Sequence, residues 1–214
     1  MTTIETISKE LEEALLSLDR IETEFILTNL ASQKDFTLVL EQNIVPIMES
    51  IGEKWERGEV ALSQVFMGGK ILEDIVDKMM PKTNTKRVDD PNIALILYKD
   101  HHLLGKRIVS SLLRARGYEF KDYGQQFDIG QLIDKLKEDN IEILLISVLM
   151  LNSALDIKKL ILQMREEKLA IKVVVGGAPF RFDIELGDEI GADYYATQAS
   201  QVLEIIEKIQ KDKS

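Results

Sequence analysis

The chain has 214 residues, of which 45% are hydrophobic and 30% are charged, and its formal net charge at pH 7 is −10. This composition is ordinary for a globular protein with a buried core, and the excess of negative charge argues against nucleic acid as a partner. The sequence contains no cysteine, which excludes disulfides, thiolate zinc sites, cysteine-ligated iron–sulfur clusters and a catalytic thiol.

The N-terminal residues give no targeting signal. The opening segment, Met1-Thr2-Thr3-Ile4-Glu5, has neither the basic region nor the apolar stretch of a secretory signal peptide. No apolar run approaches the length that spans a bilayer. We therefore expect a cytoplasmic protein without membrane contact.

Residues 1–80 show helical periodicity and no strand-like alternation. Apolar residues recur three or four positions apart, as on one face of a helix. They fall at Leu11, Leu15 and Leu18, at Phe25, Ile26 and Leu30, and at Val45, Met48, Ile51, Gly52 and Trp55. A further helix is predicted over residues 62–79, after a break at Arg57-Gly58-Glu59. The short connections predict a bundle of about four antiparallel helices.

A polar segment bounded by Pro81 and Pro91 lacks periodicity and is predicted to be a linker. We therefore expect a helical domain over residues 1–88, which includes the linker from about residue 81, and a second domain over residues 89–214.

From residue 92 onward, apolar runs alternate with helical patterns. Strands are predicted over residues 93–98, 118–123, 141–148, 171–175 and 193–196, and helices over residues 105–116, 129–137, 155–167, 182–190 and 200–211. Gly117 and Gly191 stand where helix-ending glycines are expected. This alternation predicts a doubly wound, five-stranded parallel sheet. The number of strands fits the flavodoxin-like order 2-1-3-4-5, with its switch point between the first and third strands.

Three polar or glycine-rich segments follow the first, third and fourth predicted strands. They are the segments 100–105, 147–153 and 176–179. Both histidines of the chain, His101 and His102, lie in the first segment, and Asp100 precedes them. An imidazole is a common metal ligand, and a nearby carboxylate can accept the proton of its other nitrogen. Because ligands of open α/β sheets bind at the carboxyl ends of the strands, we expect these segments to form one site.

Each segment also has a purely structural interpretation. Adjacent histidines in a loop are usually exposed to solvent, and Ser147 could bond its own backbone at a strand end. The Gly176-Gly177 pair could form a tight turn. Ser153 could cap the helix predicted from residue 155.

Taken together, the three segments resemble the cobalamin-binding fingerprint of the methionine synthase and methyltransferase corrinoid-protein family. The residues that match are Asp100, His102 and Gly105, then Ser147 and Leu149, then Gly176 and Gly177. The run 105–109 is similar to the family's Gly-Lys-Asn-Ile-Val, and residues 45–59 resemble part of its helical cap domain. Two positions depart from the family pattern, because Leu103 stands where an acidic residue is common and Arg107 where asparagine is common.

The resemblance implies a role for each of these residues. Cobalamin would bind with its own benzimidazole displaced from cobalt, and His102 would be the metal ligand, with His101 as a competing imidazole. Asp100 would bond the other ring nitrogen, and Ser153 would continue this relay. The displaced nucleotide tail would lie along the residues without side chains, bonded by one hydroxyl and packed by one leucine. These residues are Gly105, Gly176 and Gly177, with Ser147 and Leu149.

The resemblance also implies a function. The chain would be a corrinoid methyl carrier that serves a substrate-specific methyltransferase, an acceptor methyltransferase and a corrinoid reductive activase, and it would not catalyse substrate activation alone. The helical domain would shield the cofactor, although the residues proposed for this could equally form the bundle core. They are Val45, Met48, Trp55, Val65, Phe66 and Met67. A cobalamin-dependent sensor or regulator is the alternative function, and a mutase subunit ranks last.

Overall fold

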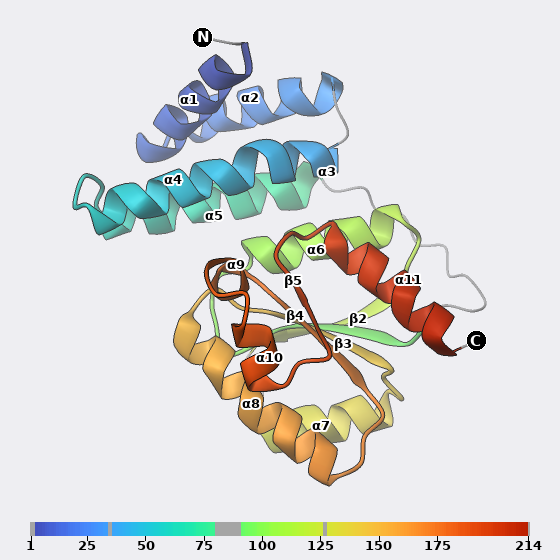
Figure 1. Ribbon diagram of the computed structural model, residues 1–214. Coiled ribbons are helices and arrows are strands. Elements are labelled where there is room, and N and C mark those ends of the chain that lie inside the picture. The colour runs from blue at the N-terminus through green and yellow to red at the C-terminus, as the bar shows by residue number, and fades with distance from the viewer. Residues whose placement is uncertain (1–2, 34–35, 80–90, 126–127, 214) are drawn as a thin grey trace. The chain divides into compact units, whose positions relative to one another are not determined.

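The computed structural model describes residues 3–33, 36–79, 91–125 and 128–213. The chain forms two compact units, Met1–Met80 and Pro81–Ser214, which are shown in Figure 1. The boundary expected between residues 88 and 89 falls outside the described residues, and so does most of the predicted linker. That boundary therefore stays a prediction.

The first unit is built from helices, as the periodicity predicts. Its elements are α1 (Thr3–Leu16), α2 (Arg20–Gln33), α3 (Phe36–Val39), η1 (Leu40–Ile44), α4 (Val45–Glu56) and α5 (Leu62–Met79). The segments α3, η1 and α4 follow one another without a break, and η1 is a π-helical turn. Pro46 explains this wider turn, because its ring lacks an N–H and clashes with the carbonyl four residues earlier.

Several residues proposed to shield a cofactor lie outside the core of this unit. Trp55, Phe66 and Met67 are exposed, while Val45, Met48 and Val65 are half-buried. Packing in the bundle core is therefore the wrong interpretation for the three exposed side chains. Their shielding role stays a prediction.

The second unit contains a five-stranded parallel sheet. Its strands are β1 (Ile93–Leu97), β2 (Phe120–Gln125), β3 (Ile143–Ser147), β4 (Lys172–Gly176) and β5 (Tyr194–Ala196). The order is β2-β1-β3-β4-β5, and every neighbouring pair is parallel. The predicted flavodoxin-like topology is confirmed. Both β1 and β3 are buried along their whole length, as expected for central parallel strands.

Helices cover both faces of the sheet (Figure 1). The helices are α6 (Leu104–Ala115), α7 (Ile129–Glu138), α8 (Leu151–Glu166), α9 (Ala178–Phe182), α10 (Leu186–Ile190) and α11 (Gln201–Lys213). The core on one face joins alternate residues of the central strands to α7, α8, α9 and α10. The opposite face packs against α6 and α11 (Figure 1). Among the described residues, no helix is both long and apolar enough to cross a membrane.

The helix boundaries differ from the prediction in two places. The helix expected from residue 155 already begins at Leu151, and the helix expected over residues 182–190 is two short helices, α9 and α10. Pro179 starts α9 early because proline suits the first turn of a helix, and Asp183 then adopts an extended backbone that ends it. Gly117 and Gly191 have positive φ, as expected for helix-ending glycines.

Candidate functional site

The three predicted segments meet at the carboxyl edge of the sheet. Leu97, Ser147 and Gly176 are register partners on β1, β3 and β4, so they form one row across the sheet. The segment from residue 98 to the start of α6 follows the first of these strands at the switch point between β1 and β3. The topology therefore brings the predicted polar residues together where α/β proteins bind ligands.

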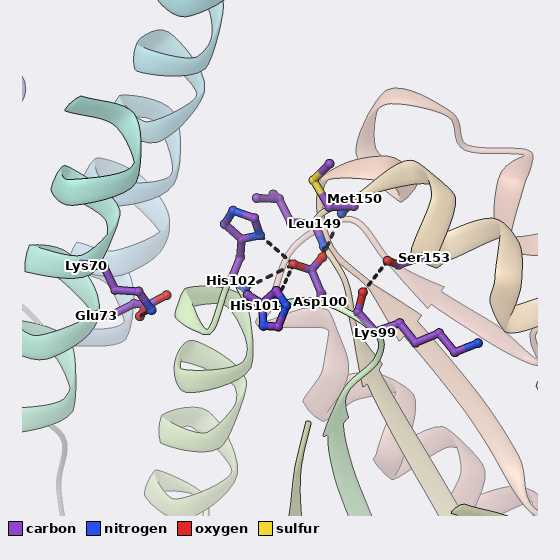
Figure 2. A network of polar contacts seen from close by, with 9 residues as sticks. All are labelled: Lys70, Glu73, Lys99, Asp100, His101, His102, Leu149, Met150 and Ser153. Atoms are coloured by element: carbon purple, nitrogen blue, oxygen red, sulfur yellow. Dashed lines mark hydrogen bonds and ion pairs between the residues drawn. The ribbon is translucent and has the colours of Figure 1, made fainter. Parts of the chain in front are cut away.

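An oriented imidazole lies at the centre of this edge (Figure 2). Nδ1 of His102 is 2.6 Å from Oδ1 of Asp100. The Asp100 side chain is 1% exposed and that of His102 is 43% exposed. Because an ionised carboxylate can only accept hydrogen bonds, Nδ1 carries the proton in this pair. Nε2 is therefore the ring nitrogen whose lone pair can bind a metal.

Asp100 is itself fixed by backbone amides (Figure 2). Its Oδ1 accepts from the amides of His101 at 2.6 Å and His102 at 3.2 Å. Its Oδ2 accepts from the amides of Leu149 at 2.7 Å and Met150 at 2.9 Å. Burial alone would raise the pKa of the Asp100 carboxyl, but the hydrogen bonds from His102 and these amides outweigh it and hold that pKa far below its usual range.

The two adjacent histidines have different roles in this geometry. His101 bonds Asp100 through its backbone amide, whereas His102 bonds it through both its amide and its ring. The carboxylate therefore orients the ring of His102. This pairing supports the prediction that His102, rather than His101, is the ligand.

Ser153 has a different partner from either of those predicted for it. The N-cap of α8 is Met150, so the interpretation of Ser153 as a helix cap is wrong. The relay inferred from the family resemblance requires its hydroxyl to contact the Asp100 carboxylate. Instead, the Ser153 hydroxyl donates to the carbonyl oxygen of Lys99 at 2.7 Å.

Ser147, which belongs to the row across the sheet, lies opposite Gly105. A Cβ atom on Gly105 would lie 3.2 Å from Oγ of Ser147. Ser147 is 8% exposed, and within the described residues its hydroxyl has no hydrogen-bond partner. It therefore does not bond its own backbone, as the structural interpretation required. Since most buried hydroxyls are paired, an orphaned one next to a glycine indicates a place for a ligand.

The two glycines after β4 differ in what the fold requires of them. A Cβ atom on Gly177 would lie 1.7 Å from the carbonyl oxygen of Val148, and the φ of Gly177 is +130°. The fold itself therefore requires glycine there, in agreement with a tight turn. A Cβ atom on Gly176 would make only ordinary contact, 3.4 Å from the Ala196 carbonyl oxygen. The fold therefore tolerates a Cβ atom at Gly176, unlike at Gly177.

Sequence reasoning missed two lysines of this region. Lys99 has a φ of +47°, which is uncommon for a residue with a Cβ atom, and its ammonium pairs with Asp156. Lys106 is buried and reaches Asp122 and the carbonyl of Gly124. Nothing in a lysine marks a left-handed backbone or burial, so the sequence held no signal for either.

The donor set limits the chemistry of the site. In the part of the chain that the structure describes, no group of three or more histidine, cysteine, aspartate or glutamate side chains could hold a metal ion. The site offers a single imidazole with a fixed carboxylate behind it. Within the described residues, this single imidazole does not by itself make a metal site held by protein side chains alone.

A helical unit followed by a flavodoxin-like sheet with this site defines a cofactor-binding α/β protein. Two family models, each described as a B12 binding domain, match residues 93–206 and 7–79. The first of these matches covers more than half of the chain. The chain belongs to the B12-binding family of corrinoid proteins.

Individual relatives are similar over nearly the whole chain. Dimethylamine corrinoid protein 1 of Methanosarcina mazei is 30% identical, over 95% of each chain. Monomethylamine corrinoid protein 2 of Methanosarcina acetivorans is 30% identical, over 81% of this chain and 82% of the relative. The solved structure of Methanosarcina barkeri monomethylamine corrinoid protein has a TM-score of 0.82 at 25% identity and covers 96% of this chain and 99% of its own.

A methanol:cobalamin methyltransferase complex from Methanosarcina barkeri is similar in fold, with a TM-score of 0.53 at 17% identity over 96% of this chain and 80% of that chain. At that identity, the likeness concerns the fold alone.

Proposed function

We propose that this chain is a corrinoid methyl carrier that binds cobalamin base-off, with Nε2 of His102 as the lower axial ligand. The observation that carries the proposal is the 2.6 Å contact between Nδ1 of His102 and Asp100. It keeps the proton on Nδ1 and directs the lone pair of the ligand through Nε2.

The displaced nucleotide tail would lie along Ser147, Gly105 and Gly176. The tail carries hydrogen-bond acceptors, and the orphaned hydroxyl of Ser147 can donate to one of them. A Cβ atom on Gly105 would lie only 3.2 Å from that hydroxyl, and Gly176 is the register partner of Ser147 on β4. Gly177 supports the site by allowing the turn after β4, and Leu149 is an exposed apolar side chain at the same edge.

The cobalt of a bound corrinoid supplies an atom that can accept a methyl group from one substrate and give it to another. The chain's own part is to hold the ligand nitrogen in place. Asp100 does this with a carboxylate that five hydrogen bonds fix, one from the ring of His102 and four from backbone amides. A ligand ring held this way keeps one tautomer and one orientation.

The names of the relatives support a choice of partners. They are dimethylamine and monomethylamine corrinoid proteins. We infer that the substrate-specific methyltransferase of this chain uses methylamines, and that an acceptor methyltransferase and a reductive activase complete the system. A cytoplasmic location belongs to the same proposal.

Absorption spectroscopy of the cobalamin-loaded protein tests the ligand. The wild-type protein and the His101→Ala variant are expected to give the same spectrum, with histidine bound to cobalt. The His102→Ala variant is expected to lose that spectrum, because its site no longer holds an imidazole next to Asp100. A His102→Ala spectrum identical to that of the wild type would contradict the proposal.

A separate assay tests the carrier role. Labelled mono- or dimethylamine is incubated with the cobalamin-loaded chain and a purified methylamine methyltransferase. We expect label to appear on the wild-type chain and to be absent from the His102→Ala chain. Transfer that is equal for both chains would contradict a carrier that works through His102.

A further inference from the structure

Two large apolar side chains are exposed to solvent where α9 ends. Phe182, the last residue of α9, is 82% exposed, and Ile184, in the link to α10, is 62% exposed. A single exposed apolar residue is common on protein surfaces, but neighbouring ones form a patch of the kind that interaction sites use. This pair is therefore worth relating to the site beside it.

The backbone places the two side chains next to each other. Asp183, which lies between them, has a φ of −129° and a ψ of 100°, an extended conformation. The residues on either side of an extended residue project to the same side of the chain. Phe182 and Ile184 therefore form one apolar pair. The Asp183 carboxylate is used locally, because its Oδ1 accepts from the amide of Glu185 at 3.0 Å.

The apolar pair is fixed at both ends. Phe180 before it and Leu186 after it are buried in the core of the second unit. The amide of Asp183 donates to the carbonyl oxygen of Pro179 at 3.0 Å, which closes the last turn of α9. Exposed side chains on a fixed backbone lose little conformational entropy when a partner covers them, so this arrangement favours a docking role.

The apolar pair lies on a connection that belongs to the proposed cofactor site. The helix α9 begins directly after Gly176 and Gly177, at the carboxyl edge of the sheet (Figure 1). It has five residues, which span about 7.5 Å, so the pair stays close to that edge. An enzyme that exchanges a methyl group with a corrinoid bound at this edge has to approach the same side of the sheet.

Acidic residues next to the apolar pair distinguish between possible occupants. Glu185, Asp188 and Glu189 are exposed, and within the described residues none of them forms an ion pair. This negative charge disfavours the phosphate of a nucleotide tail, an anionic membrane and a second copy of the same loop, since each of them brings further negative charge. It favours a protein partner that carries basic side chains around an apolar pocket.

We propose that Phe182 and Ile184 anchor the docking surface for the substrate-specific methyltransferase, which receives them in an apolar pocket bordered by lysine or arginine side chains. This inference rests on the proposed function as a methyl carrier. It adds to that function the part of the chain that recognises the enzyme.

Calorimetric titration of the cobalamin-loaded full chain with a purified methylamine methyltransferase tests the anchor. Phe182→Gln and Ile184→Gln should each raise the Kd of the complex about tenfold or more, because a few anchors carry most of the binding free energy of an interface. Phe182→Leu, which stays apolar, should raise it less than about threefold. Leu162→Gln is the matched control, since Leu162 is 51% exposed on α8, and it should leave the Kd unchanged.

A pair of charge reversals tests the chemistry of the partner. Glu185→Lys should raise the Kd about fivefold or more, because it places a positive charge against the basic border of the pocket. Glu207→Lys makes the same change on the exposed side of α11 and should leave the Kd unchanged. Equal effects of the two reversals would contradict a basic border at the apolar pair.

Other occupants of the apolar pair give different results. If cobalamin covered it, Phe182→Gln would weaken cobalamin binding in equilibrium dialysis. If a second copy covered it, the wild-type chain would sediment as a dimer and Phe182→Gln as a monomer. If the chain itself covered it, Phe182→Gln would lower the urea midpoint of the cofactor-free protein. Each of these results would overturn the docking surface.

The same titration, combined with the transfer of labelled methyl groups, separates this inference from the proposed function. Label transfer to the wild-type chain with an unchanged Kd for Phe182→Gln and Ile184→Gln would reject the docking surface alone. Binding that depends on the apolar pair, without label transfer to the wild-type chain, would reject the methyl carrier and keep the docking surface. A wild-type chain that did not bind the enzyme would overturn both.

Discussion

At the scale of single residues, Asp100 connects more of the site than any other side chain. It joins the ligand loop to the connection between β3 and α8 through the ring of His102 and the amides of Leu149 and Met150. The orientation of the imidazole and the conformation of this connection therefore depend on the same carboxylate. A change at this residue should affect both folding and ligand binding.

We predict that Asp100→Asn lowers the free energy of unfolding by about 3 kcal/mol, because an amide offers one acceptor oxygen where the carboxylate has two and leaves buried donors unpaired. Urea unfolding followed by circular dichroism measures this. Asp128→Asn is the control, since Asp128 caps α7 and asparagine caps helices equally well. If both variants lost the same small free energy of unfolding, Asp100 would not join the ligand loop to the connection between β3 and α8.

The residue types at the site could be found from the sequence, but some of their contacts could not. Asp100 and His102 are two residues apart, and the strand before them is easily identified, so their pairing is a local prediction that the structure confirms. The partner of Ser153 is the carbonyl oxygen of Lys99, which lies 54 positions away and has a positive φ. No local pattern encodes that angle.

At the scale of secondary-structure elements, the row across β1, β3 and β4 separates the needs of the fold from those of the ligand. Gly177 serves the fold, because a side chain there would collide with the Val148 carbonyl. Gly176 is not required by packing, since a Cβ atom would fit beside Ala196. Ser147, its register partner on β3, holds the orphaned hydroxyl.

We predict that Gly176→Val weakens cobalamin binding tenfold or more, because its side chain would occupy the space beside Ser147, while the cofactor-free protein still folds. Equilibrium dialysis with cobalamin and urea unfolding measure the two effects. Gly130→Ala is the control. Gly130 lies in α7, on the face of the sheet opposite to α6, and its replacement should leave the affinity for cobalamin unchanged. Unaltered affinity in Gly176→Val would rule out a tail beside this residue.

Gly177→Ala should give the opposite pattern. Its strained φ and the clash with the Val148 carbonyl are expected to lower the free energy of unfolding by about 3 kcal/mol or more before any cofactor is added. A stable Gly177→Ala protein that failed only to bind cobalamin would mean that this glycine serves the ligand instead.

The order of the elements could be predicted from sequence because alternating strands and helices allow few topologies. The start of α8 could not be predicted from the sequence. Met150 caps this helix without a side-chain bond, and its amide is satisfied by Asp100, 50 residues earlier. The helix therefore begins four residues before the position that local capping chemistry indicates.

At the scale of the whole molecule, the charge is divided very unevenly between the two units. Residues 1–80 carry seven basic and sixteen acidic side chains, a formal charge of −9, whereas residues 81–214 carry twenty and twenty-one, a charge of −1. A strongly charged unit accelerates association with a partner of opposite charge, and salt screens this effect.

We predict that the association rate constant with a methylamine methyltransferase that docks through a basic surface falls as salt is added, and that the helical unit causes this dependence. Replacing the exposed Glu10 and Glu22 by glutamine should flatten the salt dependence, measured by stopped-flow mixing. The matched change at Glu204 and Glu207, which are exposed in α11, should not. An equal effect of both pairs would mean that the total charge matters and its location does not.

The proposal that His102 binds cobalt is tested most directly by electron paramagnetic resonance of the chain loaded with Co(II) cobalamin. The chain is prepared with either ordinary or ¹⁵N-labelled histidine. The nitrogen on the lower face of cobalt splits the spectrum according to its nuclear spin. If Nε2 of His102 is the ligand, the label must convert a triplet splitting to a doublet, and His102→Ala must abolish the change. A splitting that ignores the label would show that the cofactor keeps its own base on cobalt.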